Sequence, residues 1–404
     1  MANVSSSNGL EKRPKLRFPG FDEPWKEIKI GDIFKVTRGN VLSSALVSSE
    51  KSNGYTYPVF SSQTKDDGLM GYYNEFLFED AITWTTDGAN AGTVHFRKGK
   101  FYCTNVCGVL LNSYGYANRC IAEILGRVSK RYVSYVGNPK LMNNVMSEIC
   151  IYIPSLAEQS HIDDFLLVLD KKIEKQRQLV DSLKKYKRGL SDELFSKNGA
   201  TDDWTAIPFS EAFELLQNNT FSRDEMSTEN GIVYNIHYGD VLIKYGAVVD
   251  LSKVEVPYIK SDVSLPKFAQ HSYLKDGDIV IADTAEDYTV GKAVEIAGIT
   301  DEKALSGLHT IPCRPKLSFA PMYLGYFINS NRFRAQILPL IQGTKVSSIS
   351  KSEIMKTSVV FPSYEMQSRI ASMLYTMDLK IDICNACAQE LIRTKEALMQ
   401  RLFI

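Results

Sequence analysis

The chain has 404 residues, of which 44% are hydrophobic and 23% are charged, with 47 basic and 47 acidic residues. This composition is typical of globular protein with two or three cores, and no apolar run approaches the roughly 18 residues of a membrane helix. The zero net charge argues against a uniformly basic nucleic-acid binder but allows separate basic faces. Seven cysteines without a signal peptide predict reduced thiols and a cytoplasmic protein.

The sequence predicts the same order of elements twice. Residues 1–15, rich in Ser, Asn and Lys, predict a flexible tail. Residues 16–153 and 199–361 hold short apolar runs between Asp-Gly and Lys-Gly turns, a pattern that predicts strands. Residues 154–198 and 362–404 predict a central and a C-terminal helix. We therefore expect an α+β protein with two similar domains, each followed by a long helix.

The two halves share a frame and differ in the middle. With a constant shift of 208 residues, Pro154, Ser155 and Gln159 recur as Pro362, Ser363 and Gln367, and the match continues to Phe195 and Phe403. Shorter matches open each domain at Trp25 and Trp204, with a shift of 179, and close each domain at Lys140 and Lys345, with a shift of 205. Repeated ends around divergent middles indicate a duplicated architecture with two different working surfaces.

Both predicted helices carry a heptad seam, because apolar residues recur at alternating spacings of four and three. The candidate seam residues are Ile162, Leu166, Leu169 and Ile173 in the first helix and Ile370, Leu374, Met377 and Ile381 in the second. Each helix would extend about 60 Å at 1.5 Å per residue and cannot bury its stripe alone. We predict that the two helices pair as an antiparallel coiled coil with pseudo-two-fold symmetry, with Gln176, Lys187 and Lys395 setting the register. The alternative is that the helices dimerise with another chain.

The sequence lacks the usual catalytic motifs. It contains no GxxxxGK(S/T) phosphate loop, no Pro-Pro pair of an adenine-methylating pocket and no HExxH. The acidic stretch at Asp301 and Glu302 predicts a solvated turn, not a nuclease site. Cys384 and Cys387 lie inside the heptad, and Cys103 and Cys107 flank a strand, so packing accounts for them better than zinc. We therefore expect no catalytic residue, metal or cofactor.

The divergent middles carry short polar, basic and aromatic side chains on turns. Arg and Lys suit guanine edges and phosphates, Asn and Gln suit adenine, and Ser and Thr suit either. The candidate DNA-binding residues of the first half are Arg38, Asn40, Ser62, Gln63, Lys65, Thr86, Asn90 and Arg97. Those of the second half are Asn219, Thr220, Arg223, His237, Tyr238, Lys244, Thr344 and Lys345. Two different sets on duplicated domains predict two different readers.

This layout resembles the specificity subunit of type I restriction–modification enzymes over nearly the whole chain. The resemblance is carried by the opening from Leu16 to Phe21 with Trp25, by the two helix starts after Pro154 and Pro362, and by the stretch from Asn219 to Arg223. It implies that two target-recognition domains each read half of a split, asymmetric DNA site. It also implies that the helices set the gap and dock two methyltransferase subunits, which motor-nuclease subunits join.

In such a complex, the methyl donor and ATP would belong to the partner subunits, and this chain would be non-catalytic. A split site of about 13–15 base pairs would span roughly 45–50 Å, within reach of a helix pair of about 60 Å. Two alternatives from other classes stay open at this point. One is a coiled-coil protein–protein adaptor without DNA specificity, and the other is an enzyme with an unrecognised active site, for instance a nuclease.

Overall fold

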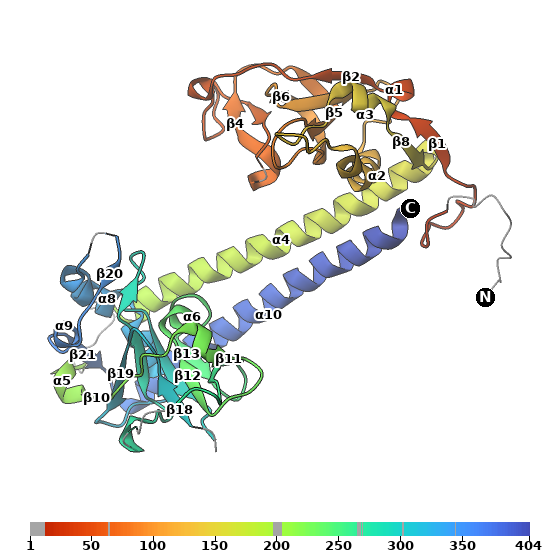
Figure 1. Cartoon of the computed structure of the whole chain (residues 1–404). Helices are drawn as coiled ribbons and strands as arrows, with labels where there is room; N and C mark the ends of the chain where they lie inside the picture. The colour runs from red at the N-terminus through yellow and green to blue at the C-terminus, as the bar shows by residue number, and fades with distance from the viewer. Residues whose placement is uncertain are drawn as a thin grey trace, which may run out of the picture. The chain divides into compact units, whose positions relative to one another are not determined.

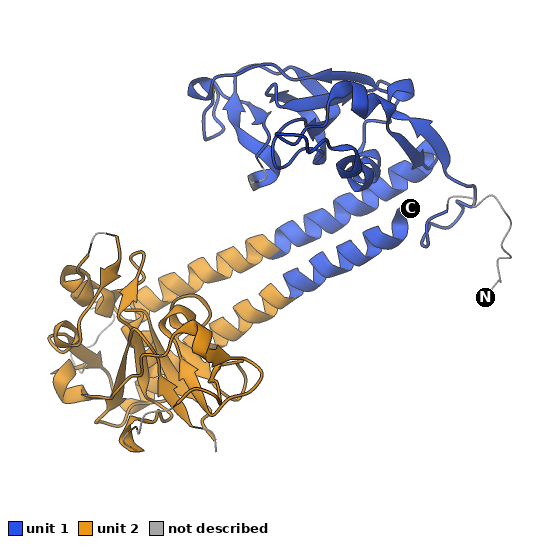
Figure 2. Ribbon diagram, in the orientation of Figure 1, with its two compact units in different colours: residues 1–176, 387–404 blue, residues 177–386 orange. Residues whose placement is uncertain are grey.

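The structure is a computed structural model that describes residues 13–63, 65–196, 204–264, 268, 270–300, 303–343 and 345–404. It divides into two compact units, residues 1–176 with 387–404 and residues 177–386 (Figure 2). Two long helices, α4 (Leu156–Leu194) and α10 (Tyr364–Leu402), each contribute to both units (Figure 1). In the described part of the chain, no helix is long and apolar enough to cross a membrane.

Unit 1 is built on a six-stranded sheet in the order β2-β7-β5-β6-β3-β4. The strands are β2 (Lys35–Arg38), β3 (Tyr57–Phe60), β4 (Leu69–Tyr73), β5 (Phe78–Thr85), β6 (Val94–Cys103) and β7 (Cys107–Leu111). The other elements are β1 (Lys26–Lys29), α1 (Ile30–Ile33), α2 (Arg119–Ser129), α3 (Asn143–Glu148) and β8 (Cys150–Ile153), with β1 and β8 paired antiparallel. The apolar side of the amphipathic helix α2 packs on the sheet, where Ile121 and Leu125 are buried with Trp84.

Unit 2 contains a five-stranded sheet in the order β10-β19-β15-β17-β13 and a four-stranded sheet in the order β11-β14-β12-β18. The first comprises β10 (Phe213–Leu215), β13 (Val248–Asp250), β15 (Ile279–Ala282), β17 (Ala293–Ala297) and β19 (Thr310–Pro315). The second comprises β11 (Met226–Ser227), β12 (Val233–Ile236), β14 (Tyr258–Ile259) and β18 (Ala304–Ser306). Short pairs join β9 (Thr205–Pro208) to β21 (Ser358–Phe361) and β16 (Thr284–Ala285) to β20 (Ser347–Ser348). The short helices are α5 (Phe209–Ala212), α6 (Tyr238–Ile243), α7 (Tyr323–Ile328), α8 (Asn331–Ile337) and α9 (Lys351–Ile354).

Five strands of unit 1 have counterparts in unit 2. The order β2-β7-β5-β6-β3 corresponds to β10-β19-β15-β17-β13, with three antiparallel pairings followed by one parallel pairing in both units. Unit 1 adds β4 at the far edge, whereas unit 2 adds the four-stranded sheet. The divergent middles of the sequence are therefore different additions to one common sheet.

The closing match of the repeats has a different register from the predicted one. The backbone N–H of Leu141 donates to Thr86 at 2.8 Å, and that of Ile349 donates to Asp283 at 2.9 Å, each just after the equivalent strand β5 or β15. Leu141 therefore corresponds to Ile349, a shift of 208 residues, and the predicted shift of 205 is wrong. Lys140-Leu141 and Lys345-Val346, the similar pairs at which the shift of 205 began, are therefore not structurally equivalent.

The two long helices run antiparallel, and each unit shows this separately. In unit 1, Lys395 Nζ of α10 lies 2.7 Å from Asp170 Oδ1 of α4, and Arg119 also bonds Asp170. In unit 2 the roles are exchanged: Lys187 Nζ of α4 lies 2.5 Å from Asp378 Oδ1 of α10, and the Tyr326 hydroxyl donates to Asp378 Oδ2 at 2.7 Å. The exchange is what the predicted pseudo-two-fold symmetry requires, and the predicted fold class is confirmed.

The predicted seam side chains are buried or half-buried on the two long helices. Ile162, Leu166, Ile173, Ile370, Leu374 and Ile381 are buried, and Leu169 and Met377 are half-buried.

The end of each long helix adds an aromatic side chain to a domain core. Phe403 packs with Trp25 in unit 1, and Phe195 packs with Tyr323 and Phe327 in unit 2. Because Phe195 is 1% exposed and Phe403 is 5% exposed, each domain core is completed by the end of the helix that follows the other domain.

The repeated glutamine fixes each helix start to its domain. The side-chain NH₂ of Gln159 and that of Gln367 each donate to the carbonyl of the proline five residues earlier, at 2.9 Å in both cases. The Gln159 side-chain oxygen accepts from Asn118 Nδ2 at 2.8 Å, and the Gln367 oxygen accepts from the Ala320 backbone N–H at 3.0 Å. Both glutamines are buried, so loss of either amide would leave buried polar groups unpaired.

The opening segment of the chain ties the two helices together in unit 1. The Arg17 guanidinium bonds both carboxylate oxygens of Glu158, at 2.9 and 2.6 Å, and Glu158 is buried at the start of α4. The Leu16 backbone N–H donates to the Arg401 carbonyl of α10 at 2.9 Å. The segment that resembles the family opening therefore acts as a structural clasp.

Unit 2 buries the carboxylate of Glu295, which backbone N–H groups hold in place. Glu295 of β17 accepts hydrogen bonds from the backbone N–H groups of Met322, at 2.5 Å, and Gly325, at 2.8 Å. Removal of the side chain from water raises the pKa of Glu295 to about 7, and these N–H groups oppose the rise only in part. Glu295 thus holds the start of α7 on the central sheet.

Candidate nucleic-acid interface

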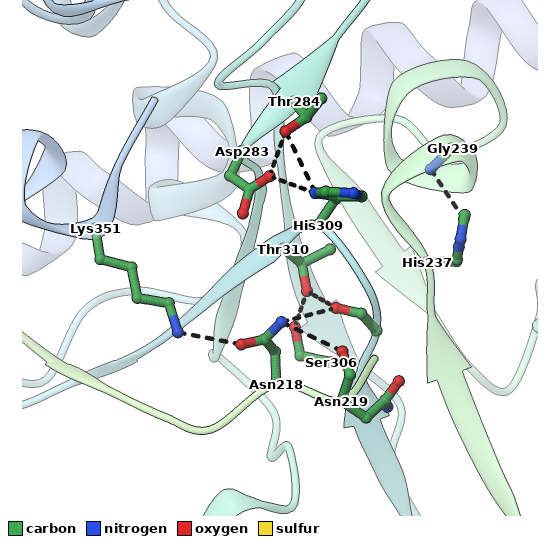
Figure 3. Close-up of polar contacts among 11 residues, drawn as sticks. Asn218, Asn219, His237, Gly239, Asp283, Thr284, Ser306, His309, Thr310 and Lys351 are labelled. Carbon is green, nitrogen blue, oxygen red and sulfur yellow. Dashed lines mark hydrogen bonds and ion pairs between the residues drawn. The ribbon is translucent and has the colours of Figure 1, made fainter. Parts of the chain in front are cut away.

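Three segments of unit 2 meet at one edge of its larger sheet. One segment follows β10, one follows β15 and one precedes β19. These three strand ends lie at the same edge because β19 lies between β10 and β15 and runs antiparallel to both. Figure 3 shows the polar side chains that converge there. Lys351 Nζ donates to Asn218 Oδ1 at 3.1 Å, and His309 Nδ1 lies 3.4 Å from Asp283 Oδ1. The edge thus presents an amide, an ammonium and an imidazole, which are all groups that bind bases or phosphates.

Buried hydroxyls support this edge from beneath. The side chains of Ser306 and Thr310 bond each other at 2.6 Å and hold the turn between β18 and β19 (Figure 3). Within that turn His309 has a φ of 52°, a conformation uncommon for a residue with a side chain. The turn presents the exposed imidazole toward Asp283 and Thr284. Strained conformations of this kind often occur at functional sites.

Unit 1 carries the corresponding edge on β2, β5 and β7. Arg38 ends β2 and Asn40 follows it, Thr86 and Asp87 follow β5, and Asn105 precedes β7. Arg38 Nη2 donates to the Asn105 carbonyl at 2.6 Å, and the Thr86 hydroxyl donates to Asp87 Oδ2 at 2.6 Å. Arg38, Asn40 and Asn105 are exposed at this edge, so they are available to a ligand.

The two edges share one backbone frame. Two of its backbone hydrogen bonds recur. The N–H of Asn40 donates to the Cys103 carbonyl at 3.2 Å, as the N–H of Asn219 donates to the Ser306 carbonyl at 2.8 Å. The N–H of Thr86 donates to the Val106 carbonyl at 2.9 Å, as the N–H of Asp283 donates to the His309 carbonyl at 3.1 Å. Thr86 of unit 1 therefore corresponds to Asp283 of unit 2, and Val106 of unit 1 corresponds to His309 of unit 2. The same frame presents different hydrogen-bonding groups in the two units.

The remaining predicted residues of unit 1 hold loops in place or are buried in the fold. Asn90 Nδ2 donates to the Ser62 carbonyl at 3.1 Å, and Gln63 bonds the Leu69 carbonyl, so both amides hold loops in place. The side chain of Lys65 lies outside the described part of the structure.

Arg97 is buried, contrary to a direct contact with DNA. Its guanidinium stacks 3.8 Å above the Phe60 ring centre, donates to Thr83 Oγ1 at 3.1 Å and donates to the Asp67 carbonyl at 2.6 Å. Burial lowers the pKa of Arg97 to about 10, which leaves it charged at neutral pH. Its donors are used within the fold, so Arg97 supports the Asp67 turn.

The predicted residues Asn219, Thr220, His237 and Tyr238 of unit 2 lie at or beside the edge. Asn219 is buried and its amide donates to Asn235 Oδ1 at 2.8 Å, whereas Thr220 is exposed. His237 Nδ1 accepts from the Gly239 backbone N–H at 3.2 Å, and burial lowers the pKa of His237, which favours the neutral ring. Tyr238 is half-buried, and its ring centre lies 5.3 Å from that of His309.

Three predicted cations of unit 2 take no part in the contacts of Figure 3. Arg223 forms two hydrogen bonds of 2.6 Å with the carboxylate of Asp240, and the pair raises the pKa of Arg223. Lys244 donates to the Glu255 carbonyl. Lys345 is exposed on the turn between Gln342 and Ser348, and the neighbouring Thr344 lies outside the described residues.

Residue-by-residue interpretation of the sequence missed Asp283, Thr284, His309 and Lys351. One signal was available: Asp283 and Thr284 directly follow the buried run Ile279–Ala282, as Thr86 follows the buried end of β5. The conformation of His309 and the approach of Lys351 to Asn218 depend on contacts distant in sequence, which local patterns do not report.

The described residues contain no group of three or more His, Cys, Asp or Glu side chains that could hold a metal ion. Cys103 and Cys107 are buried in β6 and β7. Cys384 is half-buried and Cys387 is exposed on α10. In the described structure, none of the four cysteines forms a disulfide.

The fold and the two edges define a class of protein: a duplicated binding protein that presents two different polar surfaces on one repeated frame. Residues 22–185 match the family described as the type I restriction modification DNA specificity domain. A Mycoplasma pneumoniae protein named as the N-terminus of a type I specificity subunit is 37% identical over 144 residues, which cover 35% of this chain and 75% of that protein. The chain belongs to the family of type I restriction–modification specificity subunits.

Two further similarities extend over the whole chain. The MjaVIII specificity subunit of Methanocaldococcus jannaschii is 23% identical, with 96% of this chain and 93% of that protein covered. The crystal structure of the S subunit from M. genitalium has a TM-score of 0.59 at 16% identity, covers 97% of this chain and 99% of that chain, and shows a shared fold. The chain spans half the length of another Mycoplasma pneumoniae relative, which is 33% identical over 156 residues.

Proposed function

We propose that the chain reads a split, asymmetric DNA site, with the edge of each unit reading one half. The observation that carries this proposal is the repeated frame of hydrogen bonds that presents Thr86 and Val106 in one unit and Asp283 and His309 in the other. A shared frame gives both readers the same approach to a duplex, and different side chains give them different base preferences. Arg38, Asn40, Thr220, His309 and Lys351 are the proposed direct contacts.

In this proposal, the buried residues among the predicted DNA-binding residues do not contact DNA themselves. Arg97, Asn219 and His237 use their polar groups within the fold, so they position the loops that make contact. Arg223, Lys244 and Lys345 would meet phosphates beside the half-site.

We further propose that methyltransferase subunits dock on the long helices and that motor-nuclease subunits join the complex. In unit 2, exposed apolar side chains lie on both helices: Leu179 and Tyr186 on α4, and Leu379 and Ile383 on α10. They are separate from the seam, and exposed apolar surface of this kind suits a protein partner. Family membership does not favour the alternative of an adaptor without DNA specificity. As a reader of cellular DNA the chain would act in the cytoplasm.

Grafting one domain tests the split-site proposal. Residues 30–149 are replaced by the corresponding domain of another family member, which keeps the β1 and β8 pair intact because Lys29 pairs with Cys150. One half of the recognised sequence is expected to change while the other half and the gap stay the same. Genome-wide mapping of methylated adenines in a host carrying the grafted chain measures both halves, and a graft in residues 209–357 is the matched control. Simultaneous change of both halves would contradict the proposal.

We also propose that the chain has no catalytic site of its own and that adenine methylation belongs to its partners. The purified chain is expected neither to cut plasmid DNA with Mg²⁺, with or without ATP, nor to transfer methyl groups from S-adenosylmethionine. Turnover that follows the protein through successive purification steps would refute this. Turnover that appears only when the methyltransferase subunits are added is the expected positive control.

A further inference from the structure

A turn of unit 1 carries an apolar tip directly beside the reading edge. Residues 130–140 contain the three cations Lys130, Arg131 and Lys140, two tyrosines, two valines and no acidic residue. Val133 is buried and anchors the turn, whereas Tyr135 is 70% exposed and Val136 is 91% exposed. Single exposed apolar residues are ordinary on protein surfaces, but two in succession on a protruding turn flanked by cations indicate a contact.

The base of this turn is rigid and is part of the edge itself. Ser134 and Lys140 exchange two backbone hydrogen bonds, of 2.8 and 2.9 Å, which close the loop that carries the tip. The Gly88 N–H donates to the Pro139 carbonyl at 2.9 Å, and Lys140 Nζ lies 3.9 Å from Asp87 Oδ1. A ligand that reaches Asp87 at the edge would therefore also meet the tip.

The equivalent turn of unit 2 has the same base and a different tip. Gln342 and Ser348 exchange backbone hydrogen bonds of 2.9 and 2.8 Å, as Ser134 and Lys140 do. Its described tip carries the exposed Lys345 beside Val346, which is 50% exposed. The unit 1 turn thus presents an aromatic and an aliphatic side chain, whereas the described part of the unit 2 turn presents a cation beside a valine.

We propose that the unit 1 turn is a wedge: Tyr135 and Val136 insert between base pairs next to the first half-site, while Lys130 and Arg131 meet the flanking phosphates. This inference rests on the proposed reading of DNA by the unit 1 edge. Apolar side chains that enter a base step unstack it and kink the duplex, at a cost of a few kcal/mol per step that added contacts offset. Since the unit 2 tip is charged, the distortion is confined to one half of the site.

Base-analogue fluorescence tests the wedge in the full chain bound to its methyltransferase subunits. Single 2-aminopurines are placed in turn at each step within and beside both half-sites, except at the two methylated adenines, because a methyltransferase flips its target base. Fluorescence is expected to rise several-fold at one step beside the first half-site and at none beside the second. The Tyr135→Ser/Val136→Ser variant is expected to abolish this rise, to weaken binding roughly ten-fold through the lost stacking, and to keep the same base preferences.

Both side chains are exposed, so their replacement leaves the core of unit 1 intact. Tyr114→Ser, at another exposed tyrosine of unit 1, is the matched control for surface change, and Lys345→Ser/Val346→Ser is the control for the unit 2 tip. Both are expected to retain the fluorescence rise. Specific binding by the wild-type complex without any such rise would overturn the wedge and leave split-site reading intact.

Two other results would also count against the wedge. A Tyr135→Ser/Val136→Ser variant that keeps the fluorescence rise but loses its methyltransferase subunits would assign the tip to a protein partner. A wild-type complex without sequence-specific binding would overturn both the wedge and the proposed function.

Discussion

A seven-residue insertion in α4 alone is expected to detach one helix end from its domain, whereas matched insertions in α4 and α10 are expected to be tolerated. Asp170 is held by Lys395 in unit 1, and Asp378 is held by Lys187 in unit 2. The interval between the two cross-links is the same on both helices, so both can form only while the helices keep equal lengths. A heptad adds about 10.5 Å at 1.5 Å per residue, which no side chain can span.

The single insertion, between Gln178 and Leu179, therefore leaves either Phe195 or Phe403 outside its core. Truncation of a buried phenylalanine costs roughly 3–5 kcal/mol, and a loss of this order should appear as a separate, lower thermal transition. The matched insertion adds a second heptad between Ala386 and Cys387. It keeps the seam in phase and both cross-links intact. Thermal unfolding of the two variants beside the wild type measures the difference.

The matched insertion also tests the proposed role of the helices in setting the gap. If the helix pair spaces the two readers, the gap between the half-sites should grow by about three base pairs at ~3.4 Å each, with both half-sites unchanged. Methylated adenines in a host carrying the variant report the new gap. A folded variant that modifies the original gap would show that the helices serve only to dock partners. Insertions of four residues break the heptad phase and provide the destabilised control.

The stability of unit 2 is expected to fall as the pH rises from about 5 to about 8, because of Glu295. Its pKa in the folded protein is about 7, above the ordinary 4.5, so the folded state holds the proton more tightly than the unfolded state. The resulting stabilisation is complete below about pH 4.5 and is lost as the pH rises through about 7. At 1.36 kcal/mol per pKa unit, the full contribution is roughly 3 kcal/mol.

Hydrogen exchange of β17 and α7, corrected for the intrinsic pH dependence of exchange, measures this contribution. Protection of these amides in the wild type is expected to fall between pH 5 and pH 8, and Glu295→Gln is expected to lack that component of the fall. Glu229→Gln, at an exposed glutamate of the same unit, should behave like the wild type. His237, whose pKa is lowered by burial, changes stability in the opposite direction and is common to all three proteins. An unchanged pH dependence in Glu295→Gln would remove Glu295 as its cause.

The helices were predictable because their signal is local and repeated. Ile162, Leu166 and Ile173 recur as Ile370, Leu374 and Ile381, and one period describes both helices. The ion pairs of Lys187 and Lys395 refine the predicted register-setting role, since each lysine meets an aspartate of the other helix. The order of the sheets was not predictable in the same way. The parallel pairing of β3 with β6 joins segments about forty residues apart, and no pattern within either strand encodes its partner.

The candidate site was predictable in kind but not residue by residue. Composition pointed to polar turns, and Arg38 and Asn40 do lie on an exposed edge. Arg97 looked equivalent to Arg38 in the sequence, yet Phe60 and the Asp67 carbonyl enclose it. Whether the guanidinium of an arginine is exposed, as in Arg38, or buried, as in Arg97, depends on groups that are distant in the sequence. His309 shows the opposite case, because a turn set by contacts across the sheet makes an unremarkable histidine part of the edge.

The clasp between Leu16 and Arg401 has a consequence for the order of the gene. It brings the start of the first repeat to the end of the second, within unit 1. The corresponding junction of the other repeat is the covalent stretch from Ser196 to Trp204, which leads from the end of α4 to β9. The two repeats are thus joined by a hydrogen bond in unit 1 and by the continuous chain in unit 2. A circularly permuted gene, opened between α4 and β9 and closed between α10 and β1, would encode the same set of contacts.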